Sequence, residues 1–182
     1  MTSLPSPDPF AGLLHAVAAD RVRDAAAARS RTHWLLRQAE EDGTLVGVLA
    51  DLAERAEVVV CTTRTGRRHV GVVHALGADF VALRGASGST VLLTLDAVAQ
   101  VRMQPGAAAV AGDRAMRLEQ RFVEVLGELV ADRPDVVIGT GTAEARGELR
   151  AVGQDVVTLR VDGRPPVVAY VALAAADEVR IG

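Results

Sequence analysis

The feature that most constrains the fold is an internal match between two long segments of the chain. Residues 46–102 and residues 123–180 present similar side chains in the same order. Within them, residues 71–84 (GVVHALGADFVALR) align with residues 147–160 (GELRAVGQDVVTLR), and seven of the fourteen positions are identical. Two glycines and an aspartate match in register, which valine-rich composition alone would not produce. An internal repeat indicates the unit from which a fold is built, so the sequence predicts a duplicated unit.

Each half of the match reads as a helix followed by short strands. Apolar residues at helical spacing predict a helix that Thr44 caps, and another that Asp113 opens and Pro134 ends. Five strand-like runs, several of them separated by glycines, follow each helix. The predicted strands cover residues 58–63, 68–76, 80–84, 90–95, 99–103, 136–140, 145–152, 156–161, 167–171 and 178–181.

The N-terminal part lies outside this duplication. We expect residues 1–11 to form a disordered tail and residues 12–43 to form N-terminal helices, with Ser30 as the cap of a second helical stretch. The predicted organisation then continues with a first helix-and-strand unit, a linker and a second unit, over residues 44–103, 104–112 and 113–182.

Five short, bent strands after a helix favour a small barrel, because closure removes exposed strand edges. The element order, the glycine–aspartate motifs in residues 71–83 and 147–159, and the run Thr94-Leu95-Asp96-Ala97-Val98 resemble the Sm-like barrel family of LSm and Hfq proteins. This resemblance implies an α+β fold of two helix-preceded, five-stranded Sm-like or SH3-like barrels in tandem. It also implies that outer strands pair, either between subunits or between the two barrels of one chain.

The chain departs from that family at two places. Gly77 and Gly153 stand where Sm-type motifs place an aspartate, and Asp79 and Asp155 come two positions later. Where Hfq-type proteins carry a basic pair that contacts RNA, this chain has Leu95-Asp96 and Leu173-Ala174. An aspartate there repels phosphate instead of pairing with it.

Composition and charge indicate a soluble protein of the bacterial cytoplasm. The single cysteine, Cys61, cannot form an intramolecular disulfide, and the first ten residues lack the basic region of a secretory signal. No run reaches the length of a membrane span. The net charge is −3, but residues 57–102 carry five arginines against three acidic residues, whereas residues 135–182 carry five against seven.

The densest basic cluster contains Arg64, Arg67, Arg68 and His69, in the predicted first hairpin. One interpretation is a nucleic-acid-binding loop, because arginine pairs well with phosphate. The other is a solvated hairpin tip, and residues 141–146 (GTAEAR) of the second half lack the cluster.

The shared polar residues have a structural interpretation. Gly77 with Asp79, and Gly153 with Asp155, are predicted turn residues, in which the aspartate accepts backbone N–H groups; a catalytic carboxylate is the alternative. Cys61 could pair with His69 or His74 as a nucleophile, but its place in a valine strand favours the core. The cysteine and histidines show no metal-ligand spacing, and no cofactor is expected. Residues 139–141 (GTG) resemble a phosphate loop but precede a strand, where that loop requires a helix.

The sequence therefore favours a non-enzymatic interaction or assembly module, which binds a protein partner or itself through barrel edges and has no membrane partner. The alternative is a regulator that binds RNA or another single-stranded nucleic acid through the arginine-rich first hairpin.

Overall fold

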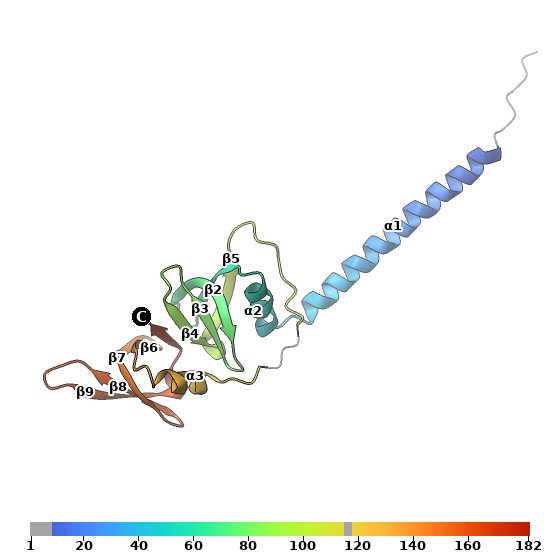
Figure 1. Ribbon diagram of the computed structural model, residues 1–182. Helices are drawn as coiled ribbons and strands as arrows, with labels where there is room; N and C mark the ends of the chain where they lie inside the picture. The colour runs from blue at the N-terminus through green and yellow to red at the C-terminus, as the bar shows by residue number, and fades with distance from the viewer. Residues whose placement is uncertain (1–8, 115–117) are drawn as a thin grey trace, which may run out of the picture. The chain divides into compact units, whose positions relative to one another are not determined.

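The computed structural model describes residues 9–114 and 118–182. The chain divides into two compact units, and the boundary lies between Asp42 and Gly43. The first unit consists of one helix, α1 (Pro9–Glu41) (Figure 1). The second unit contains every strand and the other two α-helices of the described residues. None of the helices in the described ranges combines the length and the apolar character that crossing a bilayer requires.

The two N-terminal helical stretches expected over residues 12–43 form one continuous helix. Ser30, the predicted cap, lies inside α1. Four alanines at residues 25–28 precede it; alanine has the highest helix propensity, and one serine costs well under about 1 kcal/mol, so nothing breaks the helix. Of the tail expected over residues 1–11, residues 9–11 belong to α1 and residues 1–8 lie outside the described residues.

The strands lie where the alternation of residues predicted them, to within two residues at each end. Three of the first four coincide fully with the predicted runs. The strands are β1 (Val58–Thr63), β2 (Arg68–Leu76), β3 (Phe80–Arg84), β4 (Thr90–Thr94), β5 (Val98–Met103), β6 (Asp135–Thr140), β7 (Ala143–Val152), β8 (Val156–Val161), β9 (Val167–Ala172) and β10 (Glu178–Ile181).

The arrangement of the strands contradicts the predicted fold class. All ten form a single antiparallel sheet in the order β5-β1-β2-β3-β4-β10-β6-β7-β8-β9. The sheet is open, with β5 and β9 at its two edges. The prediction of two five-stranded Sm-like or SH3-like barrels in tandem is therefore wrong. Its premise was that each set of strands must close on itself to cover its edges; instead, one edge of each set is covered by the other.

That junction consists of β4 and β10, and we call it the seam. Four residue pairs form it, from Leu93 with Glu178 to Thr90 with Ile181. On its far side β10 pairs with β6, so that the last strand of the chain lies in the middle of the sheet (Figure 1).

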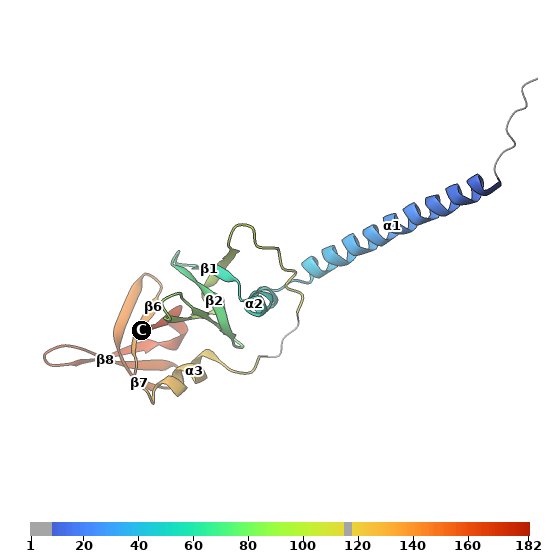
Figure 2. The same cartoon turned by 45° about the horizontal axis from the view of Figure 1, so that its top comes forward.

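Two helices cover the second unit. Thr44 caps α2 (Leu45–Glu54) as predicted, because its side chain accepts the Gly47 N–H. The other helix, α3 (Phe122–Leu129), begins later than the expected start at Asp113. Its first turn is fixed by Arg121, which is its N-cap, and by Glu124, whose carboxylate accepts the Arg121 N–H at 2.8 Å. Figure 2 shows α3 beside β7.

The sheet has two hydrophobic cores, and two neighbouring residues of β4 are buried in different cores. The first core lies under α2 and includes Leu49, Val59 and Leu93. The second lies under α3 and includes Leu126 and Ile138, but it also takes Phe80, Ala82 and Leu92 from the other side of the seam. Burial therefore joins the two parts of the sheet, in addition to the hydrogen bonds of the seam.

The connections after β2 and β7 share one local geometry. The Gly77 N–H donates to the Phe80 carbonyl, and the Gly153 N–H donates to the Val156 carbonyl. Two short 3-10 helices, η1 (Leu95–Ala97) and η2 (Leu173–Ala175), are held in the same way, because Leu95 donates to the Asp79 carbonyl and Leu173 to that of Asp155.

Candidate functional site

A charge cluster spans the seam, and Glu178 lies at its centre. The Glu178 side chain is only 1% exposed. Its Oε1 accepts a hydrogen bond from Arg67 Nη1 at 3.0 Å, and its Oε2 lies 2.5 Å from His69 Nε2. Arg67 comes from the turn between β1 and β2, and His69 from β2. The hairpin of one part of the sheet is thus bonded to the last strand of the chain.

The same arginine continues to a second hairpin. Arg67 Nη1 also donates to Glu144 Oε1 at 3.0 Å, and Arg67 Nη2 donates to the Ala143 carbonyl at 3.1 Å. Arg180 forms an ion pair with Glu144, and its Nε lies 3.5 Å from Glu178 Oε1. We call Arg67, His69, Glu144, Glu178 and Arg180 the seam cluster.

The electrostatics of the seam cluster favour an ionised Glu178. Burial alone would raise the pKa of this carboxyl. The hydrogen bonds and positive charges of His69 and Arg67 outweigh that effect, so the pKa of Glu178 lies below its ordinary value. A buried charge is tolerated only where it is paired and hydrogen-bonded, and the cluster meets that condition.

Gly139 makes room for the cluster. A Cβ at this position of β6 would lie 2.4 Å from Arg67 Nη1 and 2.6 Å from Glu178 Cγ. The glycine of residues 139–141, which resembled part of a phosphate loop, therefore serves as a gap in the sheet surface that admits the Arg67 guanidinium.

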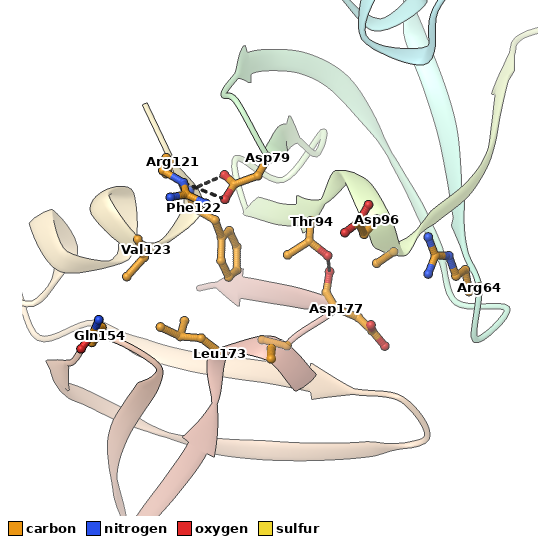
Figure 3. Close-up of a pocket in the computed structure, with 13 residues that line it drawn as sticks. Arg64, Asp79, Thr94, Asp96, Arg121, Phe122, Val123, Gln154, Leu173 and Asp177 are labelled. Carbon is orange, nitrogen blue, oxygen red and sulfur yellow. Dashed lines mark hydrogen bonds and ion pairs between the residues drawn. The ribbon is translucent and has the colours of Figure 1, made fainter. Parts of the chain in front are cut away.

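A cleft of about 480 Å³ lies beside the seam. Figure 3 shows Asp79 and Arg121 at one end and Arg64 and Asp96 at the other. Two of its aspartates bind backbone amides: Asp79 Oδ1 accepts the Phe122 N–H at 2.7 Å, and Asp177 Oδ2 accepts the Gly141 N–H at 2.9 Å. With three aspartates and two arginines in its lining, the cleft is not a cationic pocket for phosphate.

The structure separates the four residues of the predicted basic cluster. Arg67 and His69 belong to the seam cluster, where Arg67 Nη1 donates to Glu178 and His69 Nε2 lies against the same carboxylate. Arg64 lines the cleft, and Arg68 is exposed on β2. Nucleic-acid binding by this hairpin stays a prediction, and Arg64 and Arg68 are the side chains through which it would act.

The four predicted turn residues lie between strands. Gly77 and Asp79 connect β2 to β3, and Gly153 and Asp155 connect β7 to β8. Asp79 is bonded to the first amide of α3 and lies near Arg121, with Oδ2 3.6 Å from Arg121 Nε. Asp155 is exposed, and its carboxylate has no hydrogen-bond or ion-pair partner within residues 9–114 and 118–182.

Cys61 is placed in the first core. It is fully buried, and burial raises the pKa of its thiol to about 11, so the thiol stays protonated at neutral pH. His69 is its neighbour across β1 and β2, but Nε2 of that histidine faces Glu178. No group of three histidine, cysteine, aspartate or glutamate side chains within the described part of the chain is placed to hold a metal ion.

The edges of the sheet are the other candidate surface. The strand β9 pairs with β8, and β5 pairs with β1; within the described residues neither has a second neighbour. Three large side chains of β9 are exposed, with Val167 at 59%, Val168 at 53% and Tyr170 at 73%. The sequence of β9 (VVAYVA) contains neither charge nor proline, which are the usual protections of an edge strand.

Sequence reasoning missed Glu178 and the exposed face of β9. The signal for the first was weak, because Glu178 opens a strand (EVRI) that also carries the charged residue Arg180. Its partner Arg67 lies 111 positions earlier, and no local pattern connects the two.

Comparison with known proteins gives no family for this chain. A scan against models of protein families finds no match, and a search of curated proteins finds none either.

Proposed function

We propose that this protein is a non-enzymatic assembly module that binds another polypeptide strand at the free edges of its sheet. The observation that carries the proposal is β9, an uncharged edge strand with three exposed apolar or aromatic side chains, whose outer backbone groups pair with no other strand of residues 9–114 and 118–182. Such an edge is a template for strand addition, in which main-chain hydrogen bonds supply affinity and alternate side chains supply specificity.

The groups that could act chemically support a binding role. The cleft aspartates Asp79 and Asp177 hold backbone amides, and the Cys61 thiol is buried and protonated. The nucleic-acid alternative retains Arg64 and Arg68, whereas Arg67 and His69 are engaged by Glu178.

The test is site-specific crosslinking in cells that produce the full chain. A photo-crosslinking residue, p-benzoylphenylalanine, replaces Val167 on β9 in one variant and Val70 on β2 in the other. Both valines are 59% exposed, but of these two strands β9 lies at an edge of the described sheet and β2 lies inside it, so Val70 is the matched control. We expect adducts at position 167 and far fewer at position 70. Equal yields, or no adduct at position 167, would overturn the proposal.

A further inference from the structure

We propose that the strand accepted by β9 is β5 of a second copy of this chain, so that copies join head to tail. This inference rests on the proposed function and names its partner. The seam supplies the geometry, because β4 and β10 show how an outer strand of this sheet receives another one.

Three contacts at the α3 side of the sheet hold the two sides of the seam together, in addition to the strand pairing and the seam cluster. Asp79 Oδ1 accepts the Phe122 N–H, the first amide of α3, at 2.7 Å. The Ala78 N–H donates to the Gln120 carbonyl at 2.8 Å, just before that helix. Leu92 of β4 faces Val179 of β10 and is 3% exposed in the second core.

At the β9 end of the sheet, the groups that correspond to Asp79 and Leu92 have no such partner among the described residues. The Leu95 N–H donates to the Asp79 carbonyl, and the Leu173 N–H donates to the Asp155 carbonyl in the same way. These two bonds show which residues of β8 and β9 correspond to residues of β3 and β4. Asp155 then takes the place of Asp79, with its carboxylate unbonded among the described residues. Tyr170 corresponds to Leu92, because each lies three positions before the leucine that starts the following 3-10 helix. Tyr170 is 73% exposed, whereas Leu92 is buried.

The β5 end presents the receiving groups. There α2 takes the place of α3, and its first residue, Leu45, stands where Phe122 stands. Phe122 is 5% exposed and packs on Phe80, with ring centroids 6.4 Å apart, whereas Leu45 is 39% exposed. Residues 108–112 run along α2, and the Gly112 carbonyl accepts the Thr44 N–H at 2.9 Å at the start of that helix. The Leu45 side chain itself stays exposed beside this contact.

The seam also fixes the register of the proposed junction. In the seam, Leu93 pairs with Glu178. Leu93 lies two positions before the start of η1, and Glu178 lies five positions after the start of η2. The same offsets on the free edges pair Val171 with Gln100 of the second copy. The remaining pairs, listed from β9 to β5, are Tyr170 with Val101, Ala169 with Arg102 and Val168 with Met103.

Charge favours this head-to-tail arrangement over a symmetric one. Residues 57–102 carry five arginines against three acidic residues, and residues 135–182 carry five against seven. Joining β9 to β5 brings the acidic part of one copy to the basic part of the next, whereas a β9–β9 or β5–β5 dimer joins like to like. Gln100 stands where Glu178 stands in the seam, so no unpaired charge is buried. A heterologous contact of this kind builds rings or filaments.

The first measurement is the mass of the wild-type protein by size exclusion with light scattering. We expect species above the 19.0 kDa of one chain. Two variants then block one end each. Tyr170→Glu alters an exposed residue of β9, and Leu45→Glu places a carboxylate at the start of α2, where the helix dipole tolerates it but where it meets Asp155 of the neighbouring copy.

Each variant alone should be a monomer, and an equal mixture of the two should give a 1:1 dimer. That dimer uses the intact β9 of the Leu45→Glu chain and the intact β5 of the Tyr170→Glu chain, while the doubly altered junction repels. A dimer of either variant alone would indicate a symmetric contact and overturn the inference, and so would a monomeric wild-type protein. Circular dichroism establishes that both variants are folded.

The crosslinking experiment separates the two proposals. An adduct from position 167 to β5 of a second copy supports both. An adduct to a different protein overturns the head-to-tail inference and leaves the proposed function standing. The absence of an edge-specific adduct overturns both.

Discussion

Replacing Glu178 by glutamine removes the charge at the centre of the seam cluster while keeping the shape of the side chain. A glutamine accepts one hydrogen bond in place of two, and its amide NH₂ group faces a second donor. Removing one partner of a buried ion pair costs roughly 3–5 kcal/mol. Arg67 keeps Glu144 and the Ala143 carbonyl, and its side chain is 22% exposed, so its charge is not stranded. We therefore expect the lower end, about 3 kcal/mol.

The assay is urea unfolding of residues 1–182, followed by circular dichroism at a strand wavelength. At roughly 2–4 °C per kcal/mol for a domain of this size, the same loss corresponds to a fall in melting temperature of about 9 °C. Glu144→Gln is the matched control, because its side chain is 46% exposed; exposed ion pairs contribute less than about 1 kcal/mol. A Glu178→Gln loss no larger than that of the control would refute the reasoning.

The pH dependence gives a second check on the same residue. Because the pKa of Glu178 is lower in the folded protein than its ordinary value of 4.5, its stabilisation is fully present above that value. It is lost as the pH falls through the lower folded pKa. The stability difference between wild type and Glu178→Gln should therefore shrink as the pH falls below about pH 4. A difference that grows on acidification would contradict the assignment.

Two further substitutions and one reactivity follow from the packing. Gly139→Ala places a Cβ 2.4 Å from Arg67 Nη1 and 2.6 Å from Glu178 Cγ, and should lower the free energy of unfolding by about 1–3 kcal/mol. Gly127→Ala, with nothing within 4 Å of its Cβ in α3, should instead raise it by up to about 1 kcal/mol. Equal effects of the two substitutions would argue against the role of Gly139 as a gap for Arg67. Cys61, fully buried with its pKa raised to about 11, should react with iodoacetamide at neutral pH only as fast as the protein unfolds. Labelling at the rate of an unstructured cysteine would place the thiol outside the core.

The limits of sequence reasoning here follow from the distance between interacting residues. Strand positions were predictable because alternation and glycine are local signals, and the Thr44 cap of α2 is local too. Which edges pair is not local: residues 90–93 of β4 and 178–181 of β10 are ordinary strands, and nothing within either indicates the other. The barrel prediction failed at that step.

In the candidate site, too, local features were predictable from the sequence and contacts between distant residues were not. The turn positions of Gly77 and Asp79 follow from their residue types, whereas the bond from Asp79 to the Phe122 amide joins residues 43 positions apart. Arg67 and His69 were read as a solvent-facing basic loop because their acceptor, Glu178, belongs to the last strand.

The alternation of Leu92 and Leu93 between two cores determines how the protein can be divided. A fragment that ends after β5 would leave Phe80, Ala82 and Leu92 without the groups that bury them, and its counterpart would lack part of its own interior. Residues 104–121 look like a convenient place to cut a gene, yet neither product would be self-sufficient. Residues 43–182 should therefore gain and lose structure in one cooperative transition.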